Sequence, residues 1–221
     1  MRKRRESDGE LKTRAAAILR RLGKAIPEKT TALRHTSPLE MLVATILSAQ
    51  CTDERVNMVT ADLFRDFRTA KDFAKASQAD LEMRVRSTGF FRAKARNIIK
   101  CCQALVMDHH GIVPDTMEEL TALAGVGRKT ANVVLGNCFA KPEGIVVDTH
   151  VKRVSGRLGL ARSTDPEDIE QELVAIIPRR AWIDTGNLLI WHGRKTCQAR
   201  KPKCGECTLN DLCPSAEAVP A

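Results

Sequence analysis

Apolar residues recur at intervals of three and four positions along most of the chain, and this spacing gathers them on one face of an α-helix. The run from 91 to 106 shows both intervals and includes Cys101 and Cys102. We therefore interpret both cysteines as helix residues, and Cys102 as a packing residue. The short apolar run 145–147 is the one segment that fits a strand. The pattern as a whole predicts an all-α fold.

Capping signals mark where several helices begin. Residues 37–40 form a capping box with proline at the first helical position, which predicts a buried helix leading toward Gln50. A second box at 116–119 begins a short helix, and the Asp-Pro pair at 165–166 begins another. A last helix is expected to run toward Arg194, just before a segment rich in cysteine.

The composition is that of a folded, basic protein. The 221 residues are 43% hydrophobic, and 36 basic side chains stand against 27 acidic ones, a net charge of +9. This balance favours a polyanionic partner, nucleic acid before an acidic membrane. No apolar run reaches the roughly 18 to 20 residues of a membrane helix. The basic start at 1–5 lacks the apolar stretch of a secretory signal, so we interpret it as a solvated arm, with an auxiliary contact to the DNA backbone or a targeting signal as alternatives. We expect a cytoplasmic protein.

Four of the eight cysteines are crowded near the end of the chain, as Cys197, Cys204, Cys207 and Cys213. Clustering of this kind indicates a metal site and a reducing compartment rather than a disulfide framework. On chemical grounds, four thiolates bind either zinc or an iron–sulfur cluster. The spacing alone leaves both open.

A second pattern with chemistry is Gly125-Val126-Gly127, which lies between two short amphipathic helices. Such a turn exposes backbone N–H groups at the start of the second helix, where they can hold a phosphate oxygen. Because glycine has no side chain, a DNA backbone can approach it closely without regard to sequence. Standing alone, a Gly-x-Gly turn is more typical of ordinary helix-turn-helix packing.

The surrounding string, residues 123–134, resembles the helix-hairpin-helix of the endonuclease III family of DNA glycosylases, and the resemblance extends over about residues 11–213. Ala124 stands where that family usually has proline, a minor departure. The resemblance implies that Lys129 attacks C1′ of a damaged nucleotide, displaces the base and forms a Schiff base that permits β-elimination. An amine nucleophile needs a lowered pKa, which a helix N-terminus and a desolvated pocket both favour.

Further residues receive roles from the same resemblance. Asp148 matches the aspartate that assists base loss, as general base or electrostatic partner, although an aspartate before Thr149 is also typical of a helix N-cap. His150 is expected to support local structure. Gln50 matches a glutamine that fills the space left in the base stack. Phe90 matches an apolar residue at the tip of a loop, which wedges into the opposite DNA strand. Phe91 fits the apolar face of the following helix.

The cysteine spacing matches the 4Fe-4S loop of this family, so the resemblance implies that cofactor at 197–213. The cluster would act as a staple that holds a basic loop against DNA phosphates, and the glycine turn would add backbone contacts. The remaining DNA-binding candidates are therefore Gly125, Gly127, Arg128, Arg200, Lys201 and Lys203.

Two alternatives remain beside this interpretation. An adenine-mismatch glycosylase shares the hairpin and the cluster but lacks a lysine at position 129 and carries a glutamate in the helix before the glutamine. Residues 41–52 contain no acid, and Lys129 is present. A DNA-binding module with a structural metal would need neither Lys129 nor Asp148. Both residues therefore favour the enzyme.

The resemblance implies two helical domains with a DNA groove between them. Residues 31–141 would form a six-helix barrel with the hairpin, and residues 1–30 with 142–221 would form the cluster domain. The implied function is base-excision repair of oxidised pyrimidines in duplex DNA, with an AP lyase activity that cleaves abasic sites. We expect a monomer that binds double-stranded DNA at the nucleoid of a bacterial-type cell.

Overall fold

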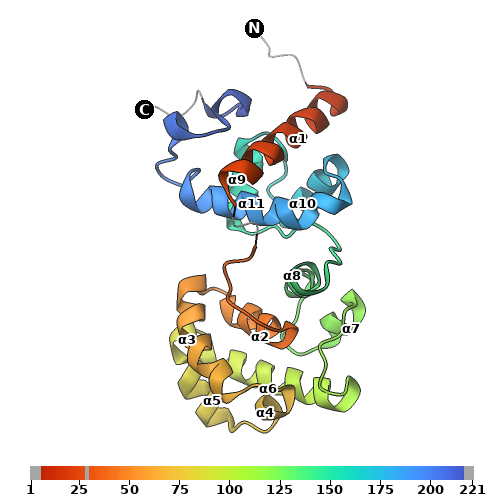
Figure 1. Cartoon of the computed structure of the whole chain (residues 1–221), viewed down its shortest axis with the longest axis vertical. Coiled ribbons are helices and arrows are strands. Elements are labelled where there is room, and N and C mark those ends of the chain that lie inside the picture. The colour runs from red at the N-terminus through yellow and green to blue at the C-terminus, as the bar shows by residue number, and fades with distance from the viewer. Residues whose placement is uncertain (1–5, 28–29, 217–221) are drawn as a thin grey trace. The chain divides into compact units, whose positions relative to one another are not determined.

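The computed structural model describes residues 6–27 and 30–216, and within these ranges the chain forms eleven α-helices joined by short turns (Figure 1). The all-α prediction is confirmed. The prediction of a strand at 145–147 is wrong: this segment is coil, and it buries the side chain of Ile145. No strand lies beside it in the described residues, and an isolated strand is not stable. The solvated arm predicted at 1–5 lies outside the described residues.

The chain divides into two compact units. The middle unit spans Thr31–Glu143, and the terminal unit combines residues 1–30 with residues 144–221. The middle unit thus ends two residues beyond the predicted boundary at 141. It contains α2 (Pro38–Ser48), α3 (Asp53–Asp66), α4 (Ala70–Ala74), α5 (Gln78–Val85), α6 (Phe91–Asp108), α7 (Met117–Ala122) and α8 (Arg128–Phe139). The terminal unit contains α1 (Asp8–Ala25), α9 (Thr149–Arg157), α10 (Pro166–Ile176) and α11 (Trp182–Lys195).

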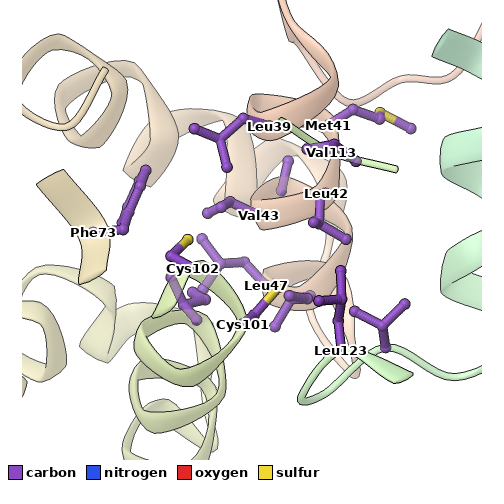
Figure 2. Close-up of a cluster of buried hydrophobic side chains, with 14 of the residues drawn as sticks. Leu39, Met41, Leu42, Val43, Leu47, Phe73, Cys101, Cys102, Val113 and Leu123 are labelled. Carbon is purple, nitrogen blue, oxygen red and sulfur yellow. The ribbon is translucent and has the colours of Figure 1, made fainter. Parts of the chain in front are cut away.

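Helix α2 forms the centre of the middle unit. Ser37 caps it by accepting a hydrogen bond from the Glu40 backbone N–H at 3.2 Å. The Glu40 carboxylate accepts from the Thr36 backbone N–H rather than that of Ser37, so the predicted capping box is shifted by one residue. Every residue from 39 to 47 except Glu40 is buried, which is typical of a helix surrounded by others. Figure 2 shows Leu42 and Leu47 in the resulting core.

Helix α6 packs against α2, α4 and α5 in the same unit. Cys101 and Cys102 both lie in its buried part, as Figure 2 shows, and burial raises the pKa of the Cys101 thiol to about 12. The packing role predicted for Cys102 is confirmed. Neither thiol is a metal ligand or nucleophile in this environment, because the reactive form is the thiolate.

The terminal unit joins segments from distant parts of the sequence, since α1 packs against α10 and α11 (Figure 1). Helices α9 and α11 approach closely at Gly193, where an added Cβ would lie 3.1 Å from His150 Cβ. This packing places the start of the cysteine segment, directly after α11, beside α9. Within the described residues no helix has the length and apolar character that crossing a membrane requires.

Candidate active site and cysteine cavity

The predicted helix–turn–helix is present in the middle unit, with α7 and α8 joined by residues 123–127. The Val126 backbone N–H donates to the Leu123 carbonyl at 3.1 Å and closes the turn. Gly125 has a φ of +77°, and a Cβ there would lie 2.8 Å from Asn97 Cβ on α6. Both the backbone conformation and the close approach of α6 therefore require glycine at this position.

Gly127 serves a different purpose, as the N-cap of α8. It provides no side-chain hydrogen bond to the helix, so the N–H groups of the first turn receive no bond from their capping residue. A Cβ added at Gly127 would meet nothing within 4 Å. The start of α8 consequently has uncapped donors beside open space, an arrangement that can accept an anion.

Lys129 lies in that first turn of α8, and its side chain is exposed. Its neighbour Arg128 donates to the Glu143 carbonyl at 3.1 Å, and the buried Asn132 accepts from the Glu143 backbone N–H at 3.0 Å. These two bonds fasten the end of the middle unit to α8. Asn132 lies within residues 123–134, which carry the family resemblance. Its burial and its hydrogen bond to Glu143 could not be predicted from the sequence.

Asp148 is the N-cap of α9 in the terminal unit, so the N-cap interpretation is confirmed. Its Oδ1 accepts hydrogen bonds from the backbone N–H groups of His150 and Val151, both at 2.8 Å. Both bonds end on Oδ1, and among the described residues Oδ2 accepts no hydrogen bond. The cap therefore holds the carboxylate in place and still leaves one oxygen for chemistry.

Gln50 and Phe90, which the resemblance assigns to contacts with the base stack, lie on exposed turns of the middle unit. Gln50 follows the end of α2 and has a φ of +53°. Phe90 has a φ of +47° and a side chain that is 66% exposed, whereas Phe91 packs partly buried against the core. Both φ values are in the left-handed region, which is uncommon for residues other than glycine and is often found at functional sites.

Lys94 was not singled out by the sequence, yet its side chain lies between these two turns. It is 4% exposed, and its Nζ donates to the carbonyls of Leu47 and Thr88, each at 2.8 Å. Burial lowers the pKa of this ammonium group. No signal in the sequence distinguishes Lys94 from a surface lysine on an amphipathic helix.

The four clustered cysteines all line one partly open cavity of the terminal unit, together with Arg157 and His192. Burial, and then the charges of the neighbouring thiolates, raise the pKa of Cys207 and of Cys213. His192 Nε2 lies 3.8 Å from Cys207 Sγ, and burial lowers the pKa of this imidazole to about 4. The cavity is thus lined with thiols that face a shared space.

Two arginines of α9 hold the loop that contains these cysteines. Arg157 donates to the carbonyls of Gln198 and Ala199 at 2.7 and 2.8 Å, and to Cys197 Sγ at 3.4 Å. Arg153 donates to the Cys197 carbonyl. These bonds fix the start of the loop, on which Arg200, Lys201 and Lys203 are exposed. Neither arginine was assigned a role from the sequence, because their partners lie some 40 residues away.

The donor set fits an iron–sulfur cluster. Within the described ranges no three His, Cys, Asp or Glu side chains converge on one point suited to a single metal ion. The four cysteines instead surround a common space, as a group of several metal and sulfur atoms requires, since each thiolate of such a cluster binds a different iron. Soft thiolate ligands are those that iron–sulfur clusters select.

Comparison with known proteins gives two family matches. Residues 43–179 match the model of the HhH-GPD superfamily base excision DNA repair protein, and residues 197–213 match the iron-sulfur binding domain of endonuclease III. The second match begins and ends at the first and last cysteines of the cavity. Together the two matches account for the hairpin, Asp148 and the cysteine loop.

Similar proteins cover nearly the whole chain. Endonuclease III of Synechocystis sp. is 52% identical over 207 residues, 94% of either chain, and that of Escherichia coli (strain K12) is 42% identical over 208 residues, 94% of this chain and 98% of the relative. A solved non-covalent endonuclease III–DNA complex is 43% identical, with a TM-score of 0.88 over 94% of this chain and 97% of that one. A thermostable thymine-DNA glycosylase, 19% identical with a TM-score of 0.82, shares the fold.

Proposed function

Because the chain belongs to the endonuclease III family of base-excision repair DNA glycosylases, we propose that Lys129 and Asp148 remove oxidised pyrimidines from duplex DNA and then cleave the strand. The protein is a DNA glycosylase with the AP lyase activity of its family. The observation that carries the assignment is an exposed lysine in the first turn of the helix that follows the glycine turn. A lysine there can reach a sugar whose phosphate is held by the same turn.

The proposed reaction runs through a covalent bond to Lys129. The unprotonated amine forms a bond to C1′ while the bond from C1′ to the base breaks, and the departing base takes up a proton. The sugar ring then opens to give a Schiff base. A proton leaves C2′, and the bond from C3′ to the phosphate oxygen breaks, which cuts the strand. Hydrolysis of the imine returns the lysine.

Asp148 is proposed to act on the same nucleotide. Its Oδ1 is held by the start of α9, so Oδ2 can stabilise the positive charge that develops on the sugar or accept a proton from the lysine. The carboxylate is already placed before DNA binds, which avoids reorganisation during the reaction. His150 beside it bonds to Arg153 and keeps a structural role.

The DNA contacts proposed here follow from exposure and from the shape of the turns. Gly125, Gly127 and Arg128 would hold phosphate at the start of α8. Gln50 would fill the space left by the extruded nucleotide, and the exposed Phe90 would wedge into the opposite strand. Arg200, Lys201 and Lys203 would neutralise further phosphates.

The protein carries a 4Fe-4S cluster, and we propose Cys197, Cys204, Cys207 and Cys213 as its ligands. When bound, the cluster supplies a covalent cross-link between the two ends of the loop. The loop's own residues provide the DNA contact. No step of base removal or strand cleavage needs an electron from the cluster.

The substrate class can be tested with a panel of labelled duplexes that contain thymine glycol, an abasic site, an A·G mismatch or no lesion. We expect strand cleavage of the thymine glycol and abasic duplexes only. Removal of adenine from the mismatch without strand cleavage would instead support the adenine-mismatch glycosylase. Binding of every duplex without cleavage of any would support the non-enzymatic module.

We further propose that the protein acts as a monomer on chromosomal DNA in the cytoplasm of a bacterial-type cell. The relatives of high identity are bacterial, and the glycine turn and the lysine occur within one chain. Light scattering should give a protein mass near 24.4 kDa for the free protein. The complex with a short duplex should give the same protein mass after the mass of the duplex is subtracted. A mass of twice that value would overturn the monomer.

A further inference from the structure

A buried lysine joins the two turns on which Gln50 and Phe90 lie. We infer that Lys94 is a positioning residue that couples these turns, so that the two side chains enter the base stack together. This inference rests on the DNA contacts proposed above for Gln50 and Phe90. It assigns a role to a residue that touches neither the substrate nor the reacting atoms.

Burial of the Lys94 ammonium group costs free energy unless favourable interactions compensate for its lost hydration. An ammonium group that is 4% exposed has lost most of its hydration, and Lys94 lies in the first turns of α6, where the helix dipole opposes a positive charge. No carboxylate among the described residues forms an ion pair with it. Its ammonium group donates two hydrogen bonds, each 2.8 Å long, to backbone carbonyls.

The first of these carbonyls belongs to Leu47, in the last turn of α2. The last four carbonyls of a helix have no donor within the helix, and a positive charge there is favourable. Lys94 therefore caps α2 from another helix. The chain turns directly after this cap, and Gln50 follows three residues later with its φ of +53°.

The second carbonyl belongs to Thr88, immediately before the turn that contains Phe90. Gly89 and Phe90 are consecutive left-handed residues, with φ of +70° and +47°. The Lys94 backbone N–H donates to the Phe90 carbonyl at 3.1 Å, which is the first bond of α6. Lys94 thus bonds to the residue before this pair and to its second member, Phe90, and helps to maintain the left-handed conformation of Phe90.

One ammonium group consequently ties the end of α2 to the turn before α6. If either turn moves, the shared donor must give up a bond or carry the other turn with it. Loss of the ammonium would leave two buried carbonyls without their donor and would let the turns move independently. The predicted effect is on extrusion of a nucleotide from a duplex, rather than on the chemistry at Lys129.

The test compares Lys94→Met with Lys100→Met, a control at an exposed position of the same helix. Borohydride trapping is measured on an abasic site in a duplex and on the same site in a single strand, where no stacked partner has to be displaced. We expect Lys94→Met to slow trapping on the duplex on the order of tenfold or more, as small displacements of positioning groups do, with little change on the single strand. Lys100→Met should change neither rate.

Two results would overturn the inference: an equal loss on both substrates, which indicates general damage to the fold, or no loss on either. If Lys94→Met does not fold, Lys94→Gln keeps an uncharged N–H donor group on a shorter side chain and is tested in the same way. Amide hydrogen exchange gives a readout that is independent of catalysis. Lys94→Met should speed exchange at both 48–52 and 86–91, and faster exchange at one segment alone would contradict the coupling. A wild-type protein that traps no abasic site would instead reject the proposed function.

Discussion

At the scale of single residues, Lys129 and Asp148 are held in different ways. Two backbone hydrogen bonds hold the Asp148 carboxylate at the start of α9, whereas Lys129 is exposed in the first turn of α8. Asp148 is therefore placed before the substrate arrives. The chemistry proposed for Lys129 requires DNA to cover its amine and to remove water from it.

Substitution of Asp148 separates its structural role from its chemical one. Asparagine is as good an N-cap as aspartate, so Asp148→Asn should leave the free energy of unfolding within about 0.5 kcal/mol of wild type, while Asp148→Ala should lose about 1 kcal/mol. Both should slow base release by roughly 10²-fold or more, because neither retains a carboxylate. Urea unfolding and single-turnover base release measure the two quantities. Wild-type base release by Asp148→Asn would show that the carboxylate only caps α9.

Residues whose roles depend on neighbours close in sequence could be predicted, and the others could not. Asp148 lies just before the helix it caps, and the placement of Lys129 in the first turn of α8 follows from the string around it. Lys94 and Arg157 instead donate to carbonyls of distant segments, at Leu47 and at Gln198. Their partners are known only once the chain has folded.

At the scale of elements, the turn between α7 and α8 uses its two glycines for different reasons. Gly125 is required by its φ of +77° and by the approach of Asn97, whereas Gly127 faces open space with an ordinary φ. The first glycine serves the fold of the middle unit. The second leaves room in front of the helix for a DNA backbone.

Alanine at each position should distinguish the two roles. Gly125→Ala forces a left-handed residue against α6 and should lower the free energy of unfolding by about 1 to 3 kcal/mol. Gly127→Ala should change it by less than about 1 kcal/mol, since only a glycine N-cap is lost, but should weaken DNA binding because a methyl group enters the open space. Thermal unfolding and fluorescence anisotropy with an abasic-site analogue test the pair. A stable Gly125→Ala, or unchanged binding by Gly127→Ala, would contradict this account.

The elements themselves were largely predictable because helix starts leave local signals. Ser37 and Asp165 cap the helices predicted from them. The short apolar run at 145–147 was misread because apolar residues alone do not tell a strand from a buried coil. It has no neighbouring strand in the described residues, so Ile145 contributes to the core without a sheet.

At the scale of the whole molecule, the excess of positive charge favours a polyanionic binding partner. Part of this positive charge lies on the cysteine loop, residues 197–213. The all-α class and two separate cores followed from the periodicity and the resemblance. The cavity that the four cysteines share did not follow from spacing alone. Spacing identifies thiols that could meet, but only the folded loop brings them around one space.

The loop's contribution to binding can be measured through its dependence on salt. Each lysine or arginine that neutralises a phosphate of duplex DNA contributes about 0.9 to the slope of log affinity against log salt concentration. Replacing Arg200, Lys201 and Lys203 together by alanine should therefore reduce the slope by up to about 2.7. A double control, Lys71→Ala with Lys75→Ala, removes exposed charges next to or within α4 and should leave the slope unchanged. An unchanged slope in the triple variant would exclude the loop from the DNA contact.

The proposed function depends on Lys129 as the nucleophile, and borohydride trapping detects the covalent bond that this residue would form. The wild-type protein is incubated with a duplex that contains thymine glycol or an abasic site, and reduction of the Schiff base makes the bond between protein and DNA permanent. We predict a covalent adduct for the wild type and for Lys100→Ala, a control at an exposed lysine of α6, and none for a folded Lys129→Ala. An adduct of wild-type yield with Lys129→Ala, or no wild-type adduct with either DNA, would contradict the account.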